Sequence, residues 1–314
     1  MQQYLSIHDV EDLSALVKEA KQLKVNPLAY EQLGKQKTLV LLFMNPSLRT
    51  RLSTQKAAQN LGMNCIVMNL QQGWRLEFEE DAVMNLDRAE HIKEAAAVIS
   101  QYADIIGIRS FPSLTNRAKD YEDFLIQQLT KYASVPVVSL ESAIRHPLQS
   151  LADTLTIEEY KKTARPKVVL TWAPHLKPLP QAVSNSFVEF MQLADVELTI
   201  TNPRGYDLAP EFVKNTPVLH DQRAAFENAD FIYAKNWSAY EPYGQLLGEH
   251  KDWRIDAKKM ALTNSGKFMH CLPVRRNIVV ADEVLDSEAS LVIEQANNRT
   301  FAAQAVLKKI LEKL

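Results

Sequence analysis

Residues 38–61 read TLVLLFMNPSLRTRLSTQKAAQNL, and this stretch decides the fold. It begins with Thr38–Phe43, an apolar run typical of a buried strand, and it ends with Gln55–Leu61, a good helical sequence. The turn between them contains residues 47–50. A strand, turn and helix in this order place backbone N–H groups and the positive end of a helix dipole at the carboxyl edge of a sheet. The stretch therefore predicts an α/β fold with an anion site at this turn.

The same alternation continues through the first half of the chain. Short apolar runs that predict buried strands recur at residues 64–68, 104–108 and 136–140. The segment 90–101 is expected to be a helix with one apolar face, formed by Ile92, Ala95, Ala96 and Ile99. Alternating strands and helices predict a parallel sheet with helices on both sides.

The pattern begins again after about residue 147. Helices are expected at 149–161, 181–193 and 297–314, and strands at 167–171, 196–200 and 230–233. We therefore predict two Rossmann-like domains, residues 1–147 and 148–314, each with a parallel sheet flanked by helices. This division suits a chain of 314 residues, because domains commonly hold about 100 to 200. The closing helix, about 297–314, is expected to pack back on the first domain.

Composition argues against several classes of function. With 36 Lys and Arg against 38 Asp and Glu, the formal net charge is -2, and no global basic surface favours nucleic acid or membrane as a partner. The two cysteines, Cys65 and Cys271, stand far apart, which disfavours disulfides and structural zinc. No basic leader with an apolar segment opens the chain, and no run approaches the roughly 18 apolar residues of a membrane span. We expect a cytoplasmic protein.

The turn at residues 47–50 admits two interpretations. Ser47, Thr50 and Ser53 offer hydroxyl donors, and Arg49 offers a planar fork matched to two phosphate oxygens. The alternative is an ordinary N-cap, in which a hydroxyl closes the first helical turn and the arginines are solvated. Neither a Walker phosphate loop nor a GxGxxG motif occurs, which argues against nucleotide kinases and dehydrogenases.

Further polar residues lie near the ends of predicted strands. Arg109 directly follows the strand at 104–108, and His146 and Gln149 flank the predicted domain boundary. Ligands collect at the carboxyl ends of strands in α/β folds, and an imidazole with a carboxamide can hydrogen-bond a carbonyl oxygen and an amide. An ion pair for Arg109 and a structural role for His146 are the alternatives.

A second cluster of functional groups occupies residues 270–277, HCLPVRRN. A catalytic dyad of His270 and Cys271 is disfavoured, because adjacent residues of an extended segment point to opposite sides. Cys271 is therefore expected to contribute backbone or packing. The proline-rich segment 173–180 is expected to be a stiff scaffold. Trp74 lies in a predicted loop, where an indole can fill a local gap or insert into a neighbouring molecule.

Together these motifs resemble the aspartate and ornithine transcarbamylase superfamily. Its signatures Ser-x-Arg-Thr, His-Pro-x-Gln and His-Cys-Leu-Pro occur at 47–50, 146–149 and 270–273, in the same order, and the resemblance covers essentially the whole chain. The branch of N-acetylornithine and N-succinylornithine transcarbamylases is most similar, through TWAPH at 171–175, AKNW at 234–237 and LPVRRN at 272–277. The resemblance implies a carbamoyltransferase of arginine biosynthesis that needs no cofactor and no metal.

The resemblance also assigns roles to residues. Carbamoyl phosphate would be held by Ser47, Leu48, Arg49, Thr50, Arg109, His146, Gln149, Arg299 and the backbone of Cys271 and Leu272. The catalytic residues among them would be Arg49, Thr50, Arg109, His146 and Gln149. An N-acylated ornithine would contact Glu141, His175, Lys235 and Arg275. The family forms homotrimers with shared active sites, in which Trp74 would come from a neighbouring subunit, and it threads its proline-rich loop into a knot.

The class of acceptor follows from Lys235. Ordinary ornithine transcarbamylases hold the free α-ammonium of ornithine with an aspartate and a Ser-Met pair, whereas the matching stretch here offers Lys235 and no aspartate. A cation would repel an ammonium and attract the carboxylate of a substrate whose α-amine is acylated.

The acyl group is predicted from Ala89. The acetyl branch has a glutamate at this position and the succinyl branch a proline, and the small, uncharged alanine leaves room for a succinyl chain. Arg88 or Arg275 could pair with its carboxylate, whereas an inward-pointing Glu90 would reverse the preference. Gln304 stands where the acetyl branch has a lysine. N-succinylornithine is the predicted acceptor, ahead of N-acetylornithine and ornithine, and a non-catalytic anion-binding protein is the rival from another class.

Overall fold

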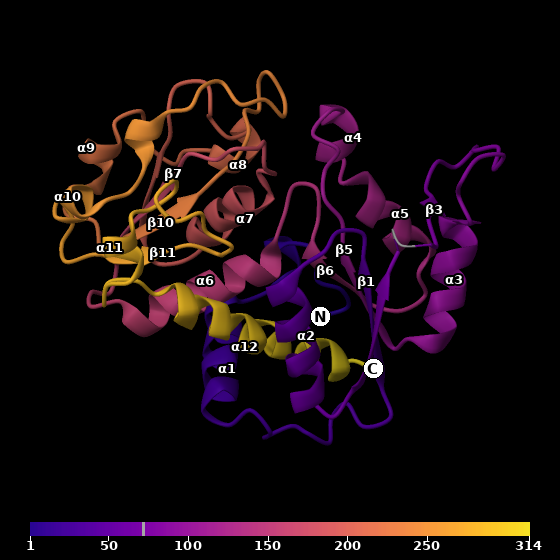
Figure 1. Cartoon of the computed structure of the whole chain (residues 1–314). Coiled ribbons are helices and arrows are strands. Elements are labelled where there is room, and N and C mark those ends of the chain that lie inside the picture. Colours follow the sequence, from indigo (N-terminus) through magenta and orange to yellow (C-terminus); the bar gives the residue numbers. More distant parts are fainter. Residues whose placement is uncertain (71–72) are drawn as a thin grey trace. The chain divides into compact units, whose positions relative to one another are not determined.

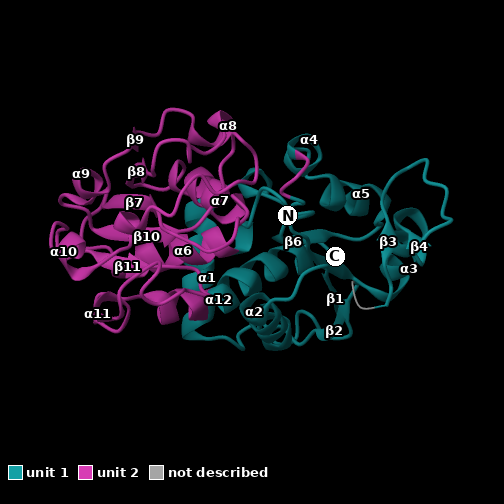
Figure 2. Ribbon diagram, turned by 45° about the horizontal axis from the view of Figure 1, so that its top comes forward, with its two compact units in different colours: residues 1–113, 117–148, 299–314 teal, residues 114–116, 149–298 magenta. Residues whose placement is uncertain are grey.

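A computed structural model of the protein describes residues 1–70 and 73–314 (Figure 1). The chain divides into two compact units (Figure 2). Unit 1 holds Met1–Ser113, Arg117–Leu148 and Arg299–Leu314, and unit 2 holds Leu114–Asn116 and Gln149–Asn298. The division falls within two helices, α6 (Pro147–Tyr160) and α12 (Val292–Leu311). The end of α12 therefore belongs to the unit that begins the chain.

Unit 1 is built on a 4-stranded parallel sheet with the order β2-β1-β5-β6. Its strands are β1 (Thr38–Phe43), β2 (Asn64–Asn69), β5 (Ile105–Arg109) and β6 (Val137–Glu141). All residues of β5 and β6 are buried, whereas the edge strand β2 is largely exposed. The apolar runs had predicted these strands, and the structure confirms them.

Helices flank this sheet, and one of them begins later than predicted. The helical elements of the unit are η1 (Ile7–Asp9), α1 (Leu13–Val25), α2 (Leu48–Asn60), α3 (Ile92–Tyr102), α4 (Arg117–Tyr121) and α5 (Phe124–Tyr132). The helix predicted from residue 90 starts only at Ile92, because β4 (Glu90–His91) pairs in parallel with β3 (Leu76–Glu77). His91 then caps α3, its Nδ1 accepting from the N–H of Lys93 at 3.2 Å.

Unit 2 contains a 5-stranded parallel sheet with the order β11-β10-β7-β8-β9. Its strands are β7 (Lys167–Trp172), β8 (Glu197–Thr201), β9 (Val218–Leu219), β10 (Phe231–Lys235) and β11 (Lys267–Met269). Between them lie α7 (Ala182–Met191), α8 (Pro210–Val213), α9 (Gln222–Phe226), η2 (Lys251–Trp253), α10 (Ala257–Met260) and α11 (Asp282–Leu285). Two parallel sheets flanked by helices confirm the predicted α/β fold.

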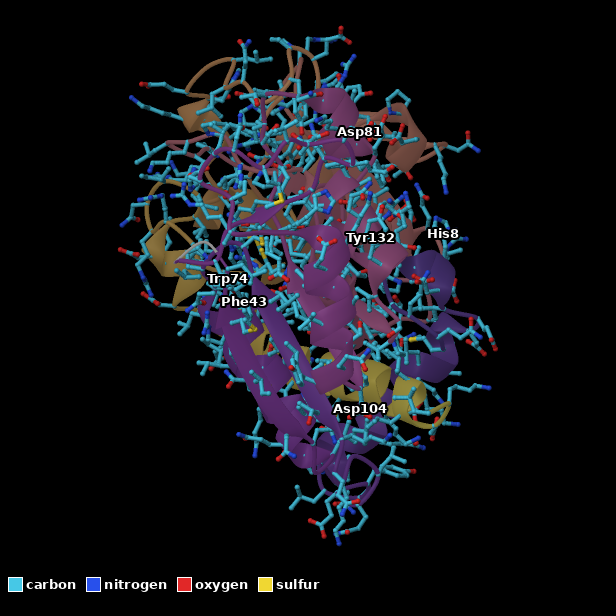
Figure 3. All side chains as sticks on the ribbon, turned by 90° about the vertical axis from the view of Figure 1, so that its right-hand side faces the viewer. His8, Phe43, Trp74, Asp81, Asp104 and Tyr132 are labelled. Carbon is cyan, nitrogen blue, oxygen red and sulfur yellow. The ribbon has the colours of Figure 1, made fainter. Side chains whose placement is uncertain are left out.

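The strand order of each sheet reverses at one place, and this positions the site. In unit 1 the chain passes from β1 outward to β2 and returns to the other side of β1 as β5. In unit 2 it passes from β7 through β8 to β9 and returns beside β7 as β10. Open α/β sheets bind ligands at the carboxyl ends of strands at such a reversal. Figure 3 labels both ends of the unit 1 sheet: Phe43 is the last residue of β1, at the carboxyl end, and Asp104 directly precedes β5, at the opposite end.

Within residues 1–70 and 73–314, no helix has both the length and the apolar character that a membrane crossing requires.

Candidate active site

The turn after β1 leads to Ser47, the N-cap of α2. The Ser47 hydroxyl accepts a hydrogen bond from the backbone N–H of Thr50 at 3.3 Å, so the N-cap interpretation holds for this hydroxyl. The anion-site interpretation is compatible with it. The first turn of any helix presents N–H groups that have no acceptor within the helix, and the helix dipole adds positive potential there.

Arg299 reaches this first turn from α12. Its Nη2 donates to Oγ1 of Thr50 at 2.6 Å, and both residues are buried, although 249 positions separate them in the sequence. The Thr50 oxygen acts as the acceptor in this bond, so its hydroxyl hydrogen can be donated to another group. Arg299 therefore adds a buried positive charge at the end of the helix where an anion would bind.

Arg109, the last residue of β5, has a buried guanidinium group. Its Nε and Nη2 donate to Oε2 of Glu141 at 3.1 and 2.8 Å. Its Nη1 donates to the carbonyl oxygens of Asn45 and Pro46 at 3.2 and 2.6 Å. These bonds fix the guanidinium between the end of β6 and the turn that precedes Ser47. The structure thus contains the ion pair that was the alternative interpretation of Arg109. Its partner is Glu141, which the resemblance had implied would contact the N-acylated ornithine.

His146 lies against the same carboxylate. Its Nε2 is 3.6 Å from Oε2 of Glu141, and both side chains are buried. Glu141 therefore stands between a guanidinium and an imidazole. This arrangement brings Arg109 and His146 together at the carboxyl ends of β5 and β6.

The turn before His146 is held by a buried aspartate, Asp123. The hydroxyl of Ser142 donates to Oδ2 of Asp123 at 2.6 Å, and the N–H of Ala143 donates to Oδ1 at 2.9 Å. Asp123 occupies the N-cap position of α5 but gives its carboxylate to this turn instead of its own helix. Burial raises the pKa of the Asp123 carboxyl, although these two hydrogen bonds oppose that shift.

In unit 2, Gln149 belongs to a buried hydrogen-bond network. Its Nε2 donates to Oδ1 of Asp153 at 2.7 Å, and Nε2 of Gln295 donates to the same oxygen at 2.7 Å. Oε1 of Gln295 accepts from the backbone N–H of His270 at 2.9 Å. The Nδ1 of His270 in turn accepts from the N–H of Leu272 at 2.9 Å. The network links Gln149 to the segment 270–273, which sequence analysis had selected separately.

The proline-rich loop after β7 is fastened to the segment after β10. Nδ2 of Asn236 donates to the carbonyl oxygens of Ala173 and Pro174, both at 2.7 Å. The N–H of Ser238 donates to the carbonyl oxygen of Leu179 at 2.9 Å. These bonds support the loop that carries His175.

Side chains add to these bonds near the end of the loop. The hydroxyl of Ser238 donates to the same Leu179 oxygen, also at 2.9 Å. Nε2 of Gln181 donates to the carbonyl oxygen of Ser238 at 3.0 Å. The loop is thus bonded at both ends, as a stiff scaffold would be.

Three residues predicted to contact the acceptor lie in unit 2: His175, Lys235 and Arg275. Nε of Arg275 donates to Nε2 of His175 at 3.3 Å, and Nδ1 of His175 lies 3.0 Å from the carbonyl oxygen of Lys177. A neutral imidazole with its proton on Nδ1 satisfies both contacts. Burial lowers the pKa of His175 below 6.5, and the charges of Lys235, Arg275 and Lys177 lower it further, against the opposing bond to the Lys177 carbonyl. Such a group of cations suits a carboxylate ligand.

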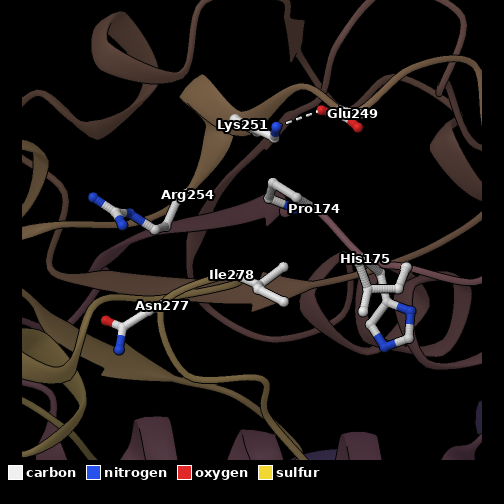
Figure 4. Close-up of a pocket in the computed structure, with 8 residues that line it drawn as sticks. Pro174, His175, Glu249, Lys251, Arg254, Asn277 and Ile278 are labelled. Carbon is white, nitrogen blue, oxygen red and sulfur yellow. Dashed lines mark ion pairs between the residues drawn. The ribbon is translucent and has the colours of Figure 1, made fainter.

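A cavity of about 470 Å³ opens beside His175 (Figure 4). Its apolar lining comes from Pro174, Leu176 and Ile278, and its polar lining from His175, Glu249, Lys251, Arg254 and Asn277. Lys251 is paired with Glu249 at 2.7 Å. This mixture suits a short aliphatic chain that ends in a charged group.

Trp74 and Ala89 lie close together in unit 1, just before the paired strands β3 and β4. The Trp74 side chain is 52% exposed, and its Nε1–H donates to Oε2 of Glu90 at 2.8 Å. The N–H of Ala89 donates to the carbonyl oxygen of Arg75 at 2.8 Å. The indole therefore holds the Glu90 carboxylate. Trp74, predicted to complete the donor site, thus lies close to Ala89, predicted to select the acyl group.

The structure divides the predicted residues between its two units. Of the residues predicted to bind carbamoyl phosphate, unit 1 holds Ser47, Leu48, Arg49, Thr50, Trp74, Arg109, His146 and Arg299, and unit 2 holds Gln149, Cys271 and Leu272. Of those predicted to contact the acceptor, unit 1 holds Ala89 and Glu141, and unit 2 holds His175, Lys235 and Arg275.

Three buried residues that bond predicted site residues, or the turns beside them, were not predicted: Asp123, Asp153 and Gln295. Asp153 had a detectable signal, because it lies four positions after Gln149 in a predicted helix and therefore on the same face. Asp123 and Gln295 had none, since their partners are distant in the sequence.

Each unit is an α/β fold built on a parallel sheet. Unit 1 has buried guanidinium groups near the N-terminus of α2, and unit 2 has a cluster of lysine and arginine side chains around His175. These features indicate an enzyme that binds small anionic substrates. Family models agree with this class. The model for the carbamoyl-P binding domain of aspartate/ornithine carbamoyltransferase matches residues 2–159, and the model for the Asp/Orn binding domain matches residues 180–310.

Individual relatives narrow the class further. The chain is 53% identical to N-succinylornithine carbamoyltransferase from Bacteroides fragilis, over 100% of both chains, and 37% identical to N-acetylornithine carbamoyltransferase from Xanthomonas campestris pv. campestris, over 96% of this chain and 94% of that one. Among solved structures, an N-acetyl-L-ornithine transcarbamylase with a glutamate replaced by alanine, complexed with carbamyl phosphate and N-succinyl-L-norvaline, is 36% identical with a TM-score of 0.93, covering 99% of this chain and 100% of that one. The chain belongs to the aspartate/ornithine carbamoyltransferase family, in the branch of the N-succinylornithine and N-acetylornithine enzymes, and is a carbamoyltransferase.

Proposed function

We propose that the protein transfers the carbamoyl group of carbamoyl phosphate to the δ-amine of N-succinyl-L-ornithine. The products are N-succinyl-L-citrulline and phosphate, in a step of arginine biosynthesis that takes place in the cytoplasm. The observation that carries the donor half of the proposal is the buried bond between Arg299 and Thr50 in the first turn of α2. It places a guanidinium where the helix N-terminus already favours a phosphate.

The chemistry needs an electrophile held beside a neutral amine. The δ-amine attacks the carbamoyl carbon, a C–N bond forms, and the bond from that carbon to the phosphate oxygen breaks. Thr50, Arg109 and His146 stabilise the charge that develops on the carbamoyl oxygen, and Gln149 holds the carbamoyl amino group. The N-terminus of α2, Arg49 and Arg299 hold the leaving phosphate, which collects the proton released by the amine.

The acceptor half of the proposal rests on charge and size. His175, Lys235 and Arg275 form a group of positive or neutral nitrogens that suits a carboxylate and would repel an α-ammonium. Ala89 supplies the small, uncharged position that a longer acyl group needs. Solved relatives in which one glutamate is replaced by alanine, proline or valine are complexed with N-succinyl-L-norvaline, which supports the expectation that an uncharged residue suits a succinyl group. N-acetylornithine is the second candidate.

The exposed surface of unit 1 supports a shared active site in a homotrimer. Apolar side chains are exposed on α2 and β2, namely Leu48, Leu52, Ile66 and Met68, and Trp74 is exposed after them. Exposed apolar residues of this number on adjoining elements are typical of an interface. A neighbouring subunit would then supply Trp74 and Ala89 together, because the two lie close together in unit 1.

Parallel assays of the purified protein test the proposed function. Carbamoyl phosphate is offered with ornithine, N-acetylornithine and N-succinylornithine, and the ureido product and phosphate are measured. We expect kcat/KM for N-succinylornithine to exceed the other two by about tenfold or more. A higher value for N-acetylornithine would overturn the choice of acceptor, and the absence of turnover with all three would overturn the proposed function.

A pair of arginine variants tests the donor site. Arg49→Ala should lower kcat/KM by about 100-fold or more, because it removes a donor to the leaving phosphate. Arg51→Ala is the matched control on the same helix, since Arg51 contacts Asn69 and the ring of Phe43 instead. It should stay within about threefold of the parent. Activity of Arg49→Ala within about threefold of the parent would sink the assignment of this loop.

A further inference from the structure

Asp153 is a fully buried carboxylate on α6 that accepts hydrogen bonds from two carboxamides. Nε2 of Gln149 and Nε2 of Gln295 both lie 2.7 Å from its Oδ1, and all three residues are 0% exposed. An oxygen that receives two N–H groups acts as a hydrogen-bond acceptor toward both. Each carboxamide must therefore turn its –NH2 group toward Asp153, because its oxygen would face another oxygen there.

This constraint decides which atom of Gln149 faces away from Asp153. Because one N–H of Nε2 donates to Asp153, Oε1 lies on the other branch of the carboxamide, and an amide oxygen accepts hydrogen bonds but donates none. The carbamoyl group has an –NH2 at the position where an acetyl group has a methyl. A site built around a buried acceptor rejects a ligand that lacks the matching donor, because the acceptor then loses that hydrogen bond.

The same carboxylate also orients the segment 270–272. Gln295 gives its Nε2 to Asp153 and therefore presents Oε1, which accepts from the N–H of His270. Nδ1 of His270 then holds the N–H of Leu272, a residue with a left-handed backbone at φ 55°. That conformation is unfavourable for a leucine unless its surroundings fix it. One aspartate thus governs both elements of unit 2 that are assigned to carbamoyl phosphate.

We infer that Asp153 is a positioning residue for the transferred group: it makes Gln149 present an oxygen, and so selects carbamoyl phosphate over acetyl phosphate. The inference rests on the proposed function. It extends that function because it names what distinguishes the donor from an analogue of the same shape and charge.

Two substitutions of Asp153 test the inference. Asp153→Leu removes the acceptor at similar size, and Asp153→Asn retains an oxygen that can accept from both glutamines. We measure KM for carbamoyl phosphate and the inhibition constant of acetyl phosphate against it, with N-succinylornithine as acceptor. In Asp153→Leu, KM should rise by about 100-fold while the inhibition constant changes by less than about threefold. Asp153→Asn should recover most of the selectivity.

A double variant separates orientation from general damage. If Asp153 selects the donor through Gln149, then in a Gln149→Ala background Asp153→Leu should change the ratio of KM to the acetyl phosphate inhibition constant by less than about threefold, since coupled residues are not additive. Additive effects would overturn the inference. Asp153→Ser, which is smaller and also lacks the fixed acceptor, replaces Asp153→Leu if circular dichroism shows that the leucine variant does not fold.

Thr156→Val is the matched control on the same helix. Oγ1 of Thr156 is buried and accepts from Nδ2 of Asn298 at 3.0 Å, a second polar link between α6 and α12. This variant should lower the melting temperature without changing the ratio of the two constants. The inference would be overturned if Thr156→Val changed the ratio of KM for carbamoyl phosphate to the inhibition constant of acetyl phosphate as much as Asp153→Leu does. It would also be overturned if both constants rose in parallel in Asp153→Leu. Failure of the parent to use carbamoyl phosphate with N-succinylornithine would overturn the proposed function instead.

Discussion

At the scale of single residues, the pKa of His175 responds to the cations around it. Burial and three nearby lysine and arginine charges lower its pKa below 6.5, so the imidazole is uncharged at neutral pH. A carboxylate bound among these groups would offset their charge and raise the pKa again.

The first prediction concerns this pKa. Followed by NMR, the His175 ring should titrate below 6.5 in the free protein and at higher pH once N-succinylornithine is bound. Because binding then takes up a proton, affinity for the acceptor should strengthen as pH falls from about 7 toward that pKa. The exposed His8, which is far from Lys177, Lys235 and Arg275 in the sequence, is the control, and its NMR signal should not change when N-succinylornithine binds. A His175 pKa that stays unchanged on binding would contradict its role.

The second prediction concerns Ala89. Ala89→Glu should lower kcat/KM for N-succinylornithine by about 100-fold, because a new carboxylate would repel the succinyl carboxylate. Activity with N-acetylornithine should fall much less, since acetyl carries no charge. Ala89→Ser adds bulk without charge and should keep the parent's preference. Equal losses for both acceptors in Ala89→Glu would show that Ala89 does not face the acyl group.

At the scale of elements, the sequence predicts what local patterns determine. The apolar runs identified β1, β5 and β6 because these strands are largely buried, and they identified β2 through its apolar residues although that edge strand is largely exposed. The short strands β9 and β11, with 2 and 3 residues, escaped because so few residues form no run. The start of α3 was predicted too early, because the pairing of β4 with β3 is a long-range contact. The Asp153 network escaped for the same reason, since Gln295 is 142 positions away.

The third prediction concerns the turn that precedes His146. Asp123→Ala removes the acceptor for Ser142 and Ala143 and should destabilise the fold by about 1 to 3 kcal/mol. It should also raise KM for carbamoyl phosphate by about tenfold or more, because His146 follows this turn. Asp104→Ala is the control, since Asp104 accepts from the Thr38 N–H at 2.8 Å and from Lys37 at 3.0 Å at the other end of the sheet. Asp104→Ala should destabilise the fold and leave KM for carbamoyl phosphate unchanged. If it raised KM as much as Asp123→Ala does, a positioning role for Asp123 would be contradicted.

At the scale of the whole molecule, sequence analysis recovered two α/β units and the chemistry of the donor loop. It could not foresee that Glu141 would bind Arg109 and lie beside His146, because burial and pairing depend on how the strands are ordered. Nor could it foresee that Trp74 would hold Glu90, since the two residues meet only through the pairing of β3 with β4.

The fourth prediction tests the shared site. Trp74→Ala and Arg49→Ala should each be nearly inactive alone. Mixed after reversible dissociation, they should regain a substantial part of the parent's activity, because some sites in a mixed trimer combine an intact Trp74 with an intact Arg49. Each variant taken alone through the same treatment is the control. A mixture with no more activity than its components would contradict the shared site.

The return of α12 to unit 1 has a consequence for the order in which the protein is made. Arg299 binds Thr50, Gln304 accepts from Asn60 at 2.9 Å, and Lys308 pairs with Glu19, so residues synthesised after unit 2 complete the unit that was begun before it. On the ribosome, Thr50 must wait until residue 299 has been synthesised and has left the exit tunnel before it can receive the Arg299 guanidinium. A nascent chain released before residue 299 would carry the whole phosphate loop and still lack the arginine that completes it.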